Sequence, residues 1–378
     1  MMSPKPKSVV IVGSAYPLRG GLANYNERIA RAYQNEGAKV KIFTFSLQYP
    51  NFLFPGKSQF SDSAAPEGLD IEVCLNSINP FSWISLGRKI KKLAPDLLII
   101  KFWIPFMGPS LGTVARIAKR NKKTKVITII DNIIPHEKRP GDRLLSNYFV
   151  KAVDGFITMS ESVLDDLKTF DTNKPKIFTP HPVYDNFGMP AAKSFAKSNI
   201  GLETKQNYIL FFGFIRDYKG LDLLLRAMAD QRIVDLGLKL IIAGEFYTDS
   251  KPYFDIIEEN KLQDQLVLAT DFIPDDKVGD YFNAADMVVQ PYKDATQSGV
   301  TQIAYHFEKP MLVTNVGGLP EIVPHLKTGY VVEVDPLKIA DGIVDFYENN
   351  REQEMIENCR EEKKKYSWET MLEKIGEL

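Results

Sequence analysis

The sequence contains few cysteines and no long apolar run. Its 378 residues include two cysteines, Cys74 and Cys359, that lie far apart, so we expect neither a disulfide framework nor a metal cluster, and a reducing cytoplasm fits. The first twelve residues hold too short an apolar run for a signal peptide, and the most apolar stretch, residues 97–111, is interrupted by a lysine and two prolines. We therefore predict a cytoplasmic protein with no membrane-spanning segment and no metal site.

The dinucleotide fingerprint G-x-G-x-x-G is also missing. The next glycines after Gly13, which follows the first apolar run, are Gly20 and Gly21, and no ribose-binding acid is evident at its usual distance. This argues against a nicotinamide-dependent oxidoreductase. Gly20 and Gly21 nevertheless place bare amides at a predicted helix start, where they could meet phosphate or sugar hydroxyls. A plain turn explains the two glycines equally well.

Length and pattern predict two α/β domains. The chain is 44% apolar and 25% charged, as in soluble globular proteins, and it is too long for one typical core. Short apolar runs alternate with helical patterns, which is typical of parallel, doubly wound, Rossmann-like sheets. Residues 184–206 are polar, contain glycine and proline, and suit a linker. The predicted strands are 8–12, 40–45, 97–102, 126–130, 155–159 and 176–179 in the first half, and 208–212, 238–242, 266–269, 287–290, 311–314 and 330–332 in the second.

Charge is distributed unequally between the two halves. Residues 1–190 carry 26 basic and 16 acidic side chains, whereas residues 191–378 carry 21 and 32, so the halves have net charges of +10 and −11. Basic clusters at 88–92 and 119–125 give the first half a surface that could rest on anionic lipid or hold an anionic acceptor. The solvated ends of two helices explain either cluster as well. Nucleic acid is not predicted as a partner.

The loops after the predicted strands are where a ligand should bind, because ligands of such folds sit at the carboxyl ends of the strands. In the second half Gly213 follows a strand, and Arg216, Lys219 and Gly220 precede a helix. A guanidinium and an ammonium at a helix start form an electropositive pocket that suits a diphosphate. Exposed basic loops are common, so this pattern alone does not decide the matter.

The run from residue 297 to residue 323 combines a helix start with a second glycine turn. Ser298 can cap a helix that begins near Gly299, which leaves free amides and the positive end of the helix dipole for an anion. The strand 311–314 then leads to a double glycine at 317–318 that lets the backbone approach a ligand. An ordinary helix, strand and turn would give the same pattern.

Two further loops carry aromatic residues. One covers residues 244–247 and contains Phe246, and the other covers residues 271–274 and contains Phe272. These rings could flank a nucleobase, and equally they could belong to the core.

The order of these motifs resembles a known family. A G-x5-KG loop, a GE loop, ADMVVQPY and QSGVTQIAYHFEKPMLVTNVGGLPEIV follow one another, after YPLRGGLANY and DNIIPHE in the first half. This order resembles retaining glycosyltransferases of the GT-B fold, glycosyltransferase family 4 (glycosyl transferases group 1). The resemblance implies an acceptor-side domain, residues 1–190, and a nucleotide-sugar-binding domain, residues 191–365, facing a central cleft. It also implies that a last helix, residues 366–378, returns to the first domain.

The resemblance assigns roles and also shows departures. Lys219 matches the lysine that holds the donor diphosphate, but the usual arginine position holds Phe214, so Arg216 is the candidate to replace it. Two glutamates of the family are missing, because their positions hold Ala295 and Ile303. Glu308 falls where a glycine is common and is not the missing acid. Gln297, Ser298 and nearby amides are therefore expected to make the sugar and phosphate contacts.

The first-half loop DNIIPHE adds one candidate. A family histidine near the donor sugar corresponds to Asp131 or Ile130, and His136 lies in the same loop, where it could contact sugar or acceptor or be structural. His181 is interpreted as structural. The predicted catalytic residues are Lys219, Arg216 and His136, and the predicted donor-binding residues are Gly20, Gly21, Gly213, Glu245, Phe246, Phe272, Ile273, Gln297, Ser298, Gly299, Val300, Thr301 and Glu321.

The predicted function is retaining transfer of a hexosyl unit from a nucleoside-diphosphate sugar to an acceptor hydroxyl, without a cofactor or metal. The acceptor would be a saccharide or a lipid-linked molecule in cell-surface polysaccharide or glycoconjugate synthesis, with peripheral contact to the inner face of the plasma membrane. Two alternatives remain open at this point. One is a sugar-nucleotide epimerase of related fold, and the other is a non-catalytic partner subunit with a degenerate donor site.

Overall fold

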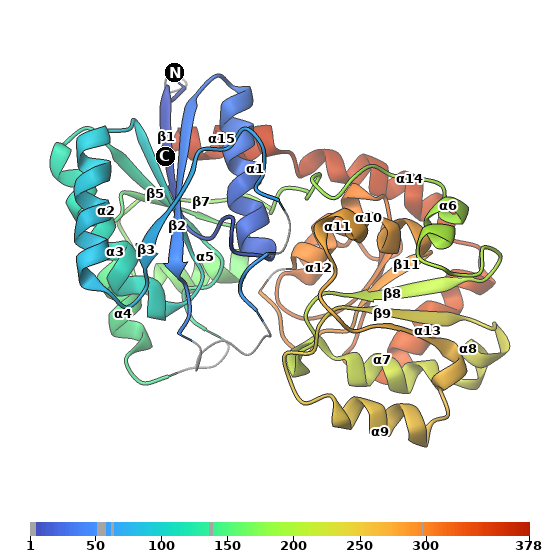
Figure 1. The fold of residues 1–378 in the computed structure, drawn as a ribbon. Coiled ribbons are helices and arrows are strands. Elements are labelled where there is room, and N and C mark those ends of the chain that lie inside the picture. The colour runs from blue at the N-terminus through green and yellow to red at the C-terminus, as the bar shows by residue number, and fades with distance from the viewer. Residues whose placement is uncertain (1–4, 51–57, 62–63, 136–138, 297) are drawn as a thin grey trace. The chain divides into compact units, whose positions relative to one another are not determined.

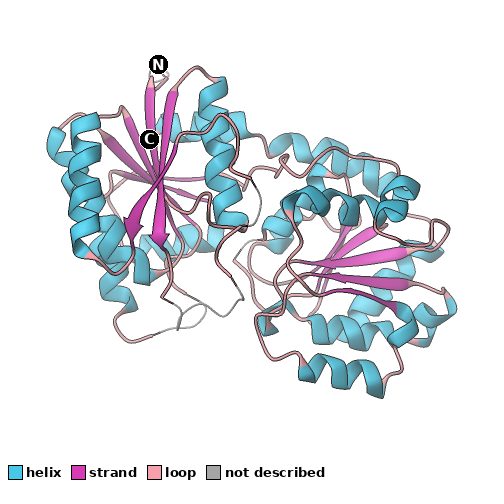
Figure 2. Ribbon diagram, viewed as in Figure 1, coloured by secondary structure: helices cyan, strands magenta, loops and turns pink. Residues whose placement is uncertain are grey.

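The chain folds into two compact units in a computed structural model that describes residues 5–50, 58–61, 64–135, 139–296 and 298–378. Unit 1 consists of Met1–Pro182 together with Ser367–Leu378, and unit 2 consists of Val183–Tyr366 (Figure 1). Each unit contains one parallel sheet with helices on both faces (Figure 2). The predicted fold class, two Rossmann-like α/β sheets, is therefore confirmed. Among the described residues, no helix is long and apolar enough to cross a membrane.

Unit 1 has a seven-stranded sheet of order β3-β2-β1-β4-β5-β6-β7. Its central strand β4 is buried along its whole length, as expected for a strand covered by helices on both faces. The strands are β1 (Ser8–Val12), β2 (Lys39–Leu47), β3 (Ile71–Asn76), β4 (Leu97–Phe102), β5 (Lys125–Ile130), β6 (Gly155–Thr158) and β7 (Lys176–Phe178).

The edge strand β3 was not predicted from the sequence. Within it only Leu75 is buried, and the other positions are partly or fully exposed. An edge strand needs little apolar surface, because one of its sides faces solvent, so its sequence lacks the apolar run that marks the other strands.

The helices of unit 1 cover the two faces of its sheet. On one face α2, α3 and α4 pack side by side, and on the other α1 packs against α15, where the rings of Tyr25 and Trp368 lie 5.1 Å apart. Helix α2 begins earlier than the predicted residue 84, because Asn79 caps the amide of Phe81 and Pro80 occupies the first turn. The helices are α1 (Gly21–Asn35), α2 (Pro80–Leu93), α3 (Gly108–Ala118), α4 (Asp142–Val150), α5 (Glu161–Lys168) and α15 (Trp368–Glu377), with short 3-10 turns at η2 (Pro105–Met107) and η3 (Lys119–Asn121).

Unit 2 has a six-stranded sheet of order β10-β9-β8-β11-β12-β13. Its strands are β8 (Tyr208–Phe212), β9 (Lys239–Ala243), β10 (Leu266–Ala269), β11 (Met287–Gln290), β12 (Met311–Thr314) and β13 (Gly329–Val332). Its helices are α6 (Lys193–Asn199), α7 (Leu221–Met228), α8 (Gln231–Asp235), α9 (Lys251–Glu259), α10 (Asp275–Ala284), α11 (Gly299–His306), α12 (Leu319–Ile322), α13 (Pro336–Glu348) and α14 (Glu352–Glu362), with 3-10 turns at η4 (Asp217–Lys219), η5 (Gln263–Gln265) and η6 (Lys363–Lys365).

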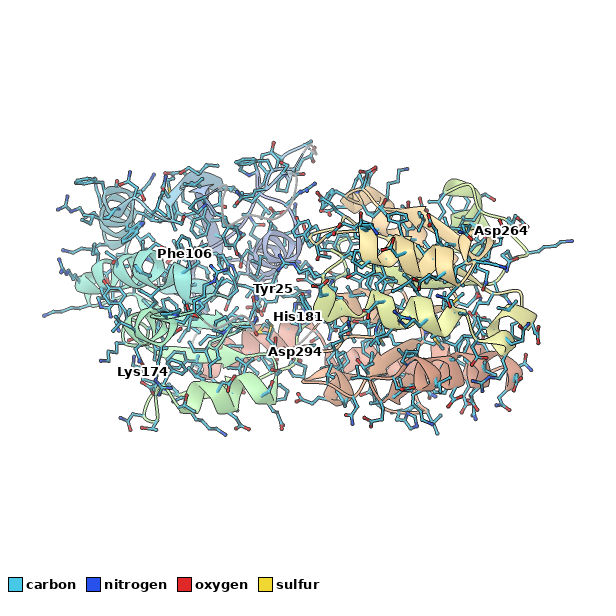
Figure 3. The ribbon with its side chains drawn as sticks, turned by 90° about the horizontal axis from the view of Figure 1, so that it is seen from below. Tyr25, Phe106, Lys174, His181, Asp264 and Asp294 are labelled. Atoms are coloured by element: carbon cyan, nitrogen blue, oxygen red, sulfur yellow. The ribbon has the colours of Figure 1, made fainter. Side chains whose placement is uncertain are left out.

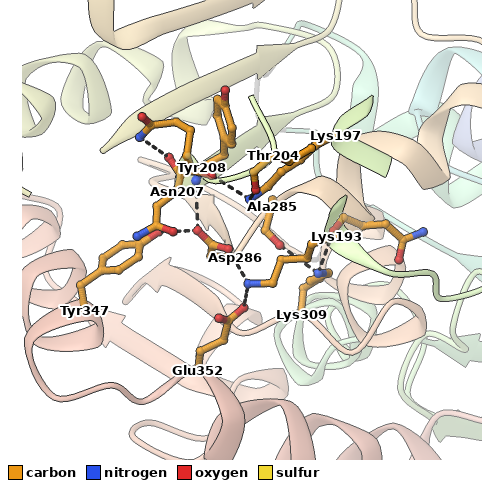
Figure 4. A network of polar contacts seen from close by, with 12 residues as sticks. Lys193, Lys197, Thr204, Asn207, Tyr208, Ala285, Asp286, Lys309, Tyr347 and Glu352 are labelled. Atoms are coloured by element: carbon orange, nitrogen blue, oxygen red, sulfur yellow. Dashed lines mark hydrogen bonds and ion pairs between the residues drawn. The ribbon is translucent and has the colours of Figure 1, made fainter. Parts of the chain in front are cut away.

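A buried polar network fastens the first helix of unit 2 to its sheet (Figure 4). Asp286, which is 2% exposed, lies just before β11 and accepts hydrogen bonds from the Tyr208 amide at 3.0 Å and the Tyr347 hydroxyl at 3.1 Å. Its other oxygen lies 2.5 Å from the ammonium of Lys193 on α6, which also pairs with Glu352 on α14. One carboxylate thus joins α6, and α13 through Tyr347, to the amino ends of β8 and β11, at the edge opposite to the loops that follow the strands.

Replacing Asp286 by asparagine should destabilise unit 2. The change keeps the shape but removes the charge that balances Lys193, so we expect a loss of about 2–3 kcal/mol in the free energy of unfolding, less than for a fully buried pair because Lys193 keeps Glu352 and some solvent. Urea unfolding followed by circular dichroism measures this loss. The control Asp341→Asn removes an exposed partner of Arg232 and should cost less than about 1 kcal/mol. Equal losses for both variants would contradict the prediction.

Candidate functional site

The loops that follow the strands of unit 2 touch one another through their backbones. A Cβ on Gly244, after β9, would lie 2.1 Å from the carbonyl oxygen of Gly213, after β8. A Cβ on Gly220 would lie 1.9 Å from the Pro291 carbonyl oxygen, and one on Gly317 would lie 1.4 Å from that of Ala295. No larger residue fits at these contacts, so glycine is required where neighbouring loops meet.

Two cations of unit 2, Arg216 and Lys219, lie close together within the loop after β8. The ammonium of Lys219 would be 3.0 Å from a Cβ on Gly213, and it lies 5.5 Å from the centre of the Tyr292 ring. Within the part of the chain that the structure describes, neither Lys219 nor Arg216 forms an ion pair. Burial, and then the positive charge of Arg216, lower the pKa of Lys219 to about 8. An anion at this place would supply the counter-charge that the described residues do not.

The start of α11 lies beside this pair. The Val300 side chain is 3.6 Å from the Cβ position of Gly213, so the first turn of the helix faces the same backbone as Lys219. The first amides of any helix lack acceptors within the helix, and they carry the positive end of its dipole. The predicted helix start at Gly299 is therefore found next to the predicted diphosphate pocket.

One detail of that prediction is wrong. Ser298 occupies the capping position, but its hydroxyl accepts no hydrogen bond from the helix amides. Instead it lies 3.4 Å from the hydroxyl of Tyr292. The side chain of Thr301 is likewise occupied, because it donates to Gln290 at 3.0 Å. The backbone amides, rather than these hydroxyls, are what the helix start offers to a ligand.

Three aromatic rings gather at the neighbouring loops. Phe214 stacks on Tyr247 with ring centres 4.2 Å apart, and it lies 6.3 Å from Phe272. The guanidinium of Arg216 is 5.3 Å from the Tyr247 ring. Phe246 does not join them, because it packs at 5.6 Å against Tyr253 on α9. Phe214 was noted in the sequence only as the position of a missing arginine, and its place in this cluster was not predicted.

The other predicted residues have separate surroundings. Glu245 is buried, and its carbonyl accepts from the Ile215 amide at 2.8 Å. Ile273 is half-buried, and Glu321 on α12 is exposed. Gly20 and Gly21 lie at the start of α1 in unit 1. His136 and Gln297 lie outside the described residues.

The two positions where the resemblance leads us to expect glutamates hold apolar residues that are buried. Ala295 is 4% exposed and Ile303 is 6% exposed. Glu308 lies past the end of α11 and pairs with Arg360 at 2.7 Å and with Lys363 at 2.8 Å. It thus joins α11 to α14 and the turn after it, and it is fully engaged in that role. In the part of the chain that the structure describes, no group of three or more His, Cys, Asp or Glu could hold a metal ion.

The two halves of the chain match two family models. Residues 19–185 match the model of glycosyltransferase family 4, and residues 193–366 match the model of glycosyl transferases group 1. Together with the two parallel sheets, these matches make the chain one of the GT-B glycosyltransferase type.

Individual proteins are similar to it at low identity. It is 24% identical over 255 residues to the D-inositol 3-phosphate glycosyltransferase of Corynebacterium urealyticum, an alignment that covers 64% of this chain and 60% of that protein. Among solved structures, sucrose-phosphate synthase from Thermosynechococcus elongatus superimposes with a TM-score of 0.74 at 16% identity, covering 98% of both chains. The structure of Anabaena HepE in complex with UDP-glucose superimposes with a TM-score of 0.71 at 14% identity, again covering 98% of both chains. These structures support the fold.

Removing the unpaired ammonium should stabilise the protein. A lysine whose pKa is lowered from 10.5 to about 8 on folding costs stability below pH 8, and this cost disappears between pH 8 and 10.5. In phosphate-free buffer at pH 7, Lys219→Met should therefore raise the free energy of unfolding by about 1–2 kcal/mol, after allowance for partial exposure. This increase in the free energy of unfolding should disappear by pH 10.5, where the lysine is neutral in the folded state and half neutral in the unfolded state.

The control for this prediction is Lys239→Met. Lys239 is a partly buried lysine of β9, 3.8 Å from Glu203, and its replacement should change stability by less than about 0.5 kcal/mol. A Lys219→Met variant that is no more stable than wild type at pH 7, or equally stabilised at both pH values, would show that the ammonium carries no burial cost.

Proposed function

We propose that the protein transfers a hexosyl unit from a nucleoside-diphosphate sugar to an acceptor hydroxyl, with the anomeric configuration retained. One observation carries the proposal: Lys219 lies over Gly213 beside Arg216 and the start of α11, and neither cation has a counter-charge among the described residues. A diphosphate brings the negative charge that this arrangement lacks. The similarity to HepE, whose structure contains UDP-glucose, supports this class of donor.

The proposed chemistry needs charge stabilisation more than a protein base. The bond from the anomeric carbon to the diphosphate oxygen breaks, and the acceptor oxygen bonds to the same carbon from the same face. The proton of the acceptor hydroxyl passes to the departing phosphate oxygen. Lys219, Arg216 and the first amides of α11 stabilise the charge that develops on the leaving group. Fixed cations of this kind can take the place of a divalent metal ion.

The aromatic cluster of Phe214, Tyr247 and Phe272 suits the nucleobase. Its rings are half-buried and lie at the loops after β8, β9 and β10. Stacking on such a surface accepts any base, because every base has a π-face. The base is therefore best identified by measurement.

A thermal-shift screen tests the donor site. UDP, GDP and ADP and their hexose derivatives should include at least one that raises the melting temperature, since ligands that bind the folded state stabilise it. Proton NMR of the product anomer then tests retention. No shift with any of these compounds would contradict the proposal.

Lys219→Ala tests the leaving-group role. At saturating donor we expect turnover to fall about 10²–10³-fold, the usual effect of removing one group that stabilises developing charge. The matched control is Lys293→Ala in the loop after β11, where the ammonium is 2.8 Å from Asp222 and already paired. Unchanged turnover in Lys219→Ala, or an equal loss in both variants, would contradict this role.

A lipid-linked acceptor at an anionic membrane on the cytoplasmic side fits the surface of unit 1. Residues 77–125 contain 11 basic side chains and a single acidic one, Asp96. The two basic clusters are adjacent, because Asn121 of η3 donates to the carbonyl of Lys91 at the end of α2. At the other end of α2, Phe81 is 82% exposed. Among the cations of these two clusters, the ones that form no ion pair with another described residue are Arg88, Lys91, Lys92, Arg120, Lys122 and Lys125.

Vesicle binding tests this surface. The protein should co-sediment with vesicles of phosphatidylglycerol but not with phosphatidylcholine, and less at high salt. The triple variant K91E/K92E/K122E should lose most of the binding, and Phe81→Ser part of it. The control K251E/K261E/K277E makes the same charge change on exposed lysines of unit 2 and should retain binding. Equal binding by both triple variants would contradict the assignment.

A further inference from the structure

The first residues of unit 2 are packed rather than linker-like. Residues 184–206 suit a linker by composition, but Tyr184 and Phe187 are only 5% and 7% exposed. The chain is also fixed just before this point, because His181 at the end of the first stretch of unit 1 lies edge-on against Tyr25 of α1, with ring centres 5.1 Å apart (Figure 3). The segment that begins unit 2 therefore has a defined place in the structure.

This segment lies along helix α11. At the first residue of the helix, a Cβ added to Gly299 would lie 3.1 Å from Cε2 of Tyr184. At the last residue, Nε2 of His306 donates a hydrogen bond to the carbonyl of Gly188 at 2.6 Å. Residues 184–188 therefore run beside α11 from one end to the other.

The last residue of unit 2 contacts the same helix. The ring of Tyr366 lies 5.1 Å from that of Tyr305 on α11. Both hydroxyls donate to the carbonyl of Ile322 at the end of α12, at 2.6 Å from Tyr305 and 3.4 Å from Tyr366. The Val183 amide donates to the carbonyl of Tyr366 at 2.9 Å. Of all these contacts to α11, the one made by Tyr184 lies at the end where the helix amides lack acceptors.

Gly299 suits the ring of Tyr184 rather than the conformation of the backbone. The φ of Gly299 lies outside the left-handed region, so the path of the chain does not require glycine there. A methyl group at this position would lie 3.1 Å from the ring, which is closer than the optimal separation of two carbon atoms, about 3.5–4.0 Å. Because Gly299 has no side chain, the ring can lie directly on the backbone of the first turn.

We infer that Tyr184 is a positioning residue, whose ring holds the first turn of α11 in place for the phosphates of the donor. This turn lies beside the lysine of the proposed diphosphate pocket, since Val300 and Lys219 both contact the Cβ position of Gly213. Hydrogen bonds weaken steeply when the donor is tilted, so amides that bind an anion need a fixed orientation. A tyrosine provides it at low cost in entropy, because its side chain has two rotatable bonds. The inference rests on the proposed function for the class of ligand.

Tyr184→Ala and Tyr184→Phe are the direct test. The first variant removes the ring, and the second keeps the ring that packs on Gly299. The probes are UDP, GDP and ADP, each titrated by calorimetry. For those that bind wild type, we expect Tyr184→Ala to weaken binding about 10-fold, as for the weakening of one hydrogen bond to a charged group, and Tyr184→Phe to remain within about 2-fold of wild type. Equal losses in both variants would overturn the role of the ring.

The matched control is Tyr347→Ala. It removes a ring of the same size from unit 2, but at the amino edge of the sheet, where the hydroxyl binds Asp286 at 3.1 Å. It should destabilise the fold, as Tyr184→Ala does, and leave nucleotide affinity as in wild type. Equal weakening of nucleotide binding in the two alanine variants would show that general loss of stability is the cause, and would overturn the inference.

Gly299→Ala tests the same contact from the helix side. In wild type the added methyl group meets the ring, so nucleotide binding should weaken about 10-fold. In the double variant Y184A/G299A the methyl group has room, so binding should be no weaker than in Tyr184→Ala alone. Losses that multiply in the double variant would show that the two residues do not act through one contact.

Amide hydrogen exchange tests the positioning without any ligand. In Tyr184→Ala the peptide that spans α11 should exchange at least about 10-fold faster than in wild type, whereas the peptide that spans β12 should be unchanged. Unchanged exchange in α11 overturns the inference, and so does faster exchange with unchanged nucleotide affinity. If wild type binds none of the three nucleotides but exchange in α11 is faster in Tyr184→Ala, the proposed function fails and the role of Tyr184 in holding the helix start stands.

Discussion

The parallel direction of the strands is the constraint on which both units depend. In a parallel sheet every strand ends at the same edge, so loops that are far apart in sequence become neighbours there. In unit 2 this brings together the loops after β8, β9 and β11 with the start of α11. In unit 1 it brings Gly13, Lys101 and Asp131 to adjoining strands β1, β4 and β5. At the opposite edge, the network around Asp286 serves stability instead.

The two units differ in whether a lysine near the carboxyl ends of their strands has a counter-charge. In unit 2 the ammonium of Lys219 lacks a counter-charge among the described residues, and its pKa is lowered to about 8. In unit 1 the ammonium of Lys101 is balanced by Asp131, so the charge is internal and the carboxylate keeps a fixed place. Under the proposed function, the first arrangement suits binding of a diphosphate.

The sequence predicted the alternation of strands and helices well, because buried parallel strands are continuous apolar runs. It did not reveal β3, where only Leu75 is buried, nor the start of α2, where Asn79 and Pro80 were the overlooked signal. The helix that starts at Gly299 was predicted correctly, but the hydroxyl of Ser298 lies near that of Tyr292 instead of capping the helix. The hydrogen-bond partner of a hydroxyl depends on the tertiary structure and cannot be read from the neighbouring sequence. The aromatic role of Phe214 was missed for a similar reason, since its neighbours Tyr247 and Phe272 come from other loops. Glu308 has a φ of 56°, a left-handed conformation that glycine adopts more easily than any other residue.

The backbone contacts at Gly213, Gly220, Gly244 and Gly317 have a consequence for how such a site changes over evolution. Because main chain meets main chain there with no side chain between, the frame of the loops does not depend on which residues form the rim. Under the proposed function, substitutions at rim positions such as Phe214 or Phe272 would exchange one recognised base for another while the first amides of α11 stay where they are. Selectivity can therefore diverge quickly in a scaffold whose backbone barely changes.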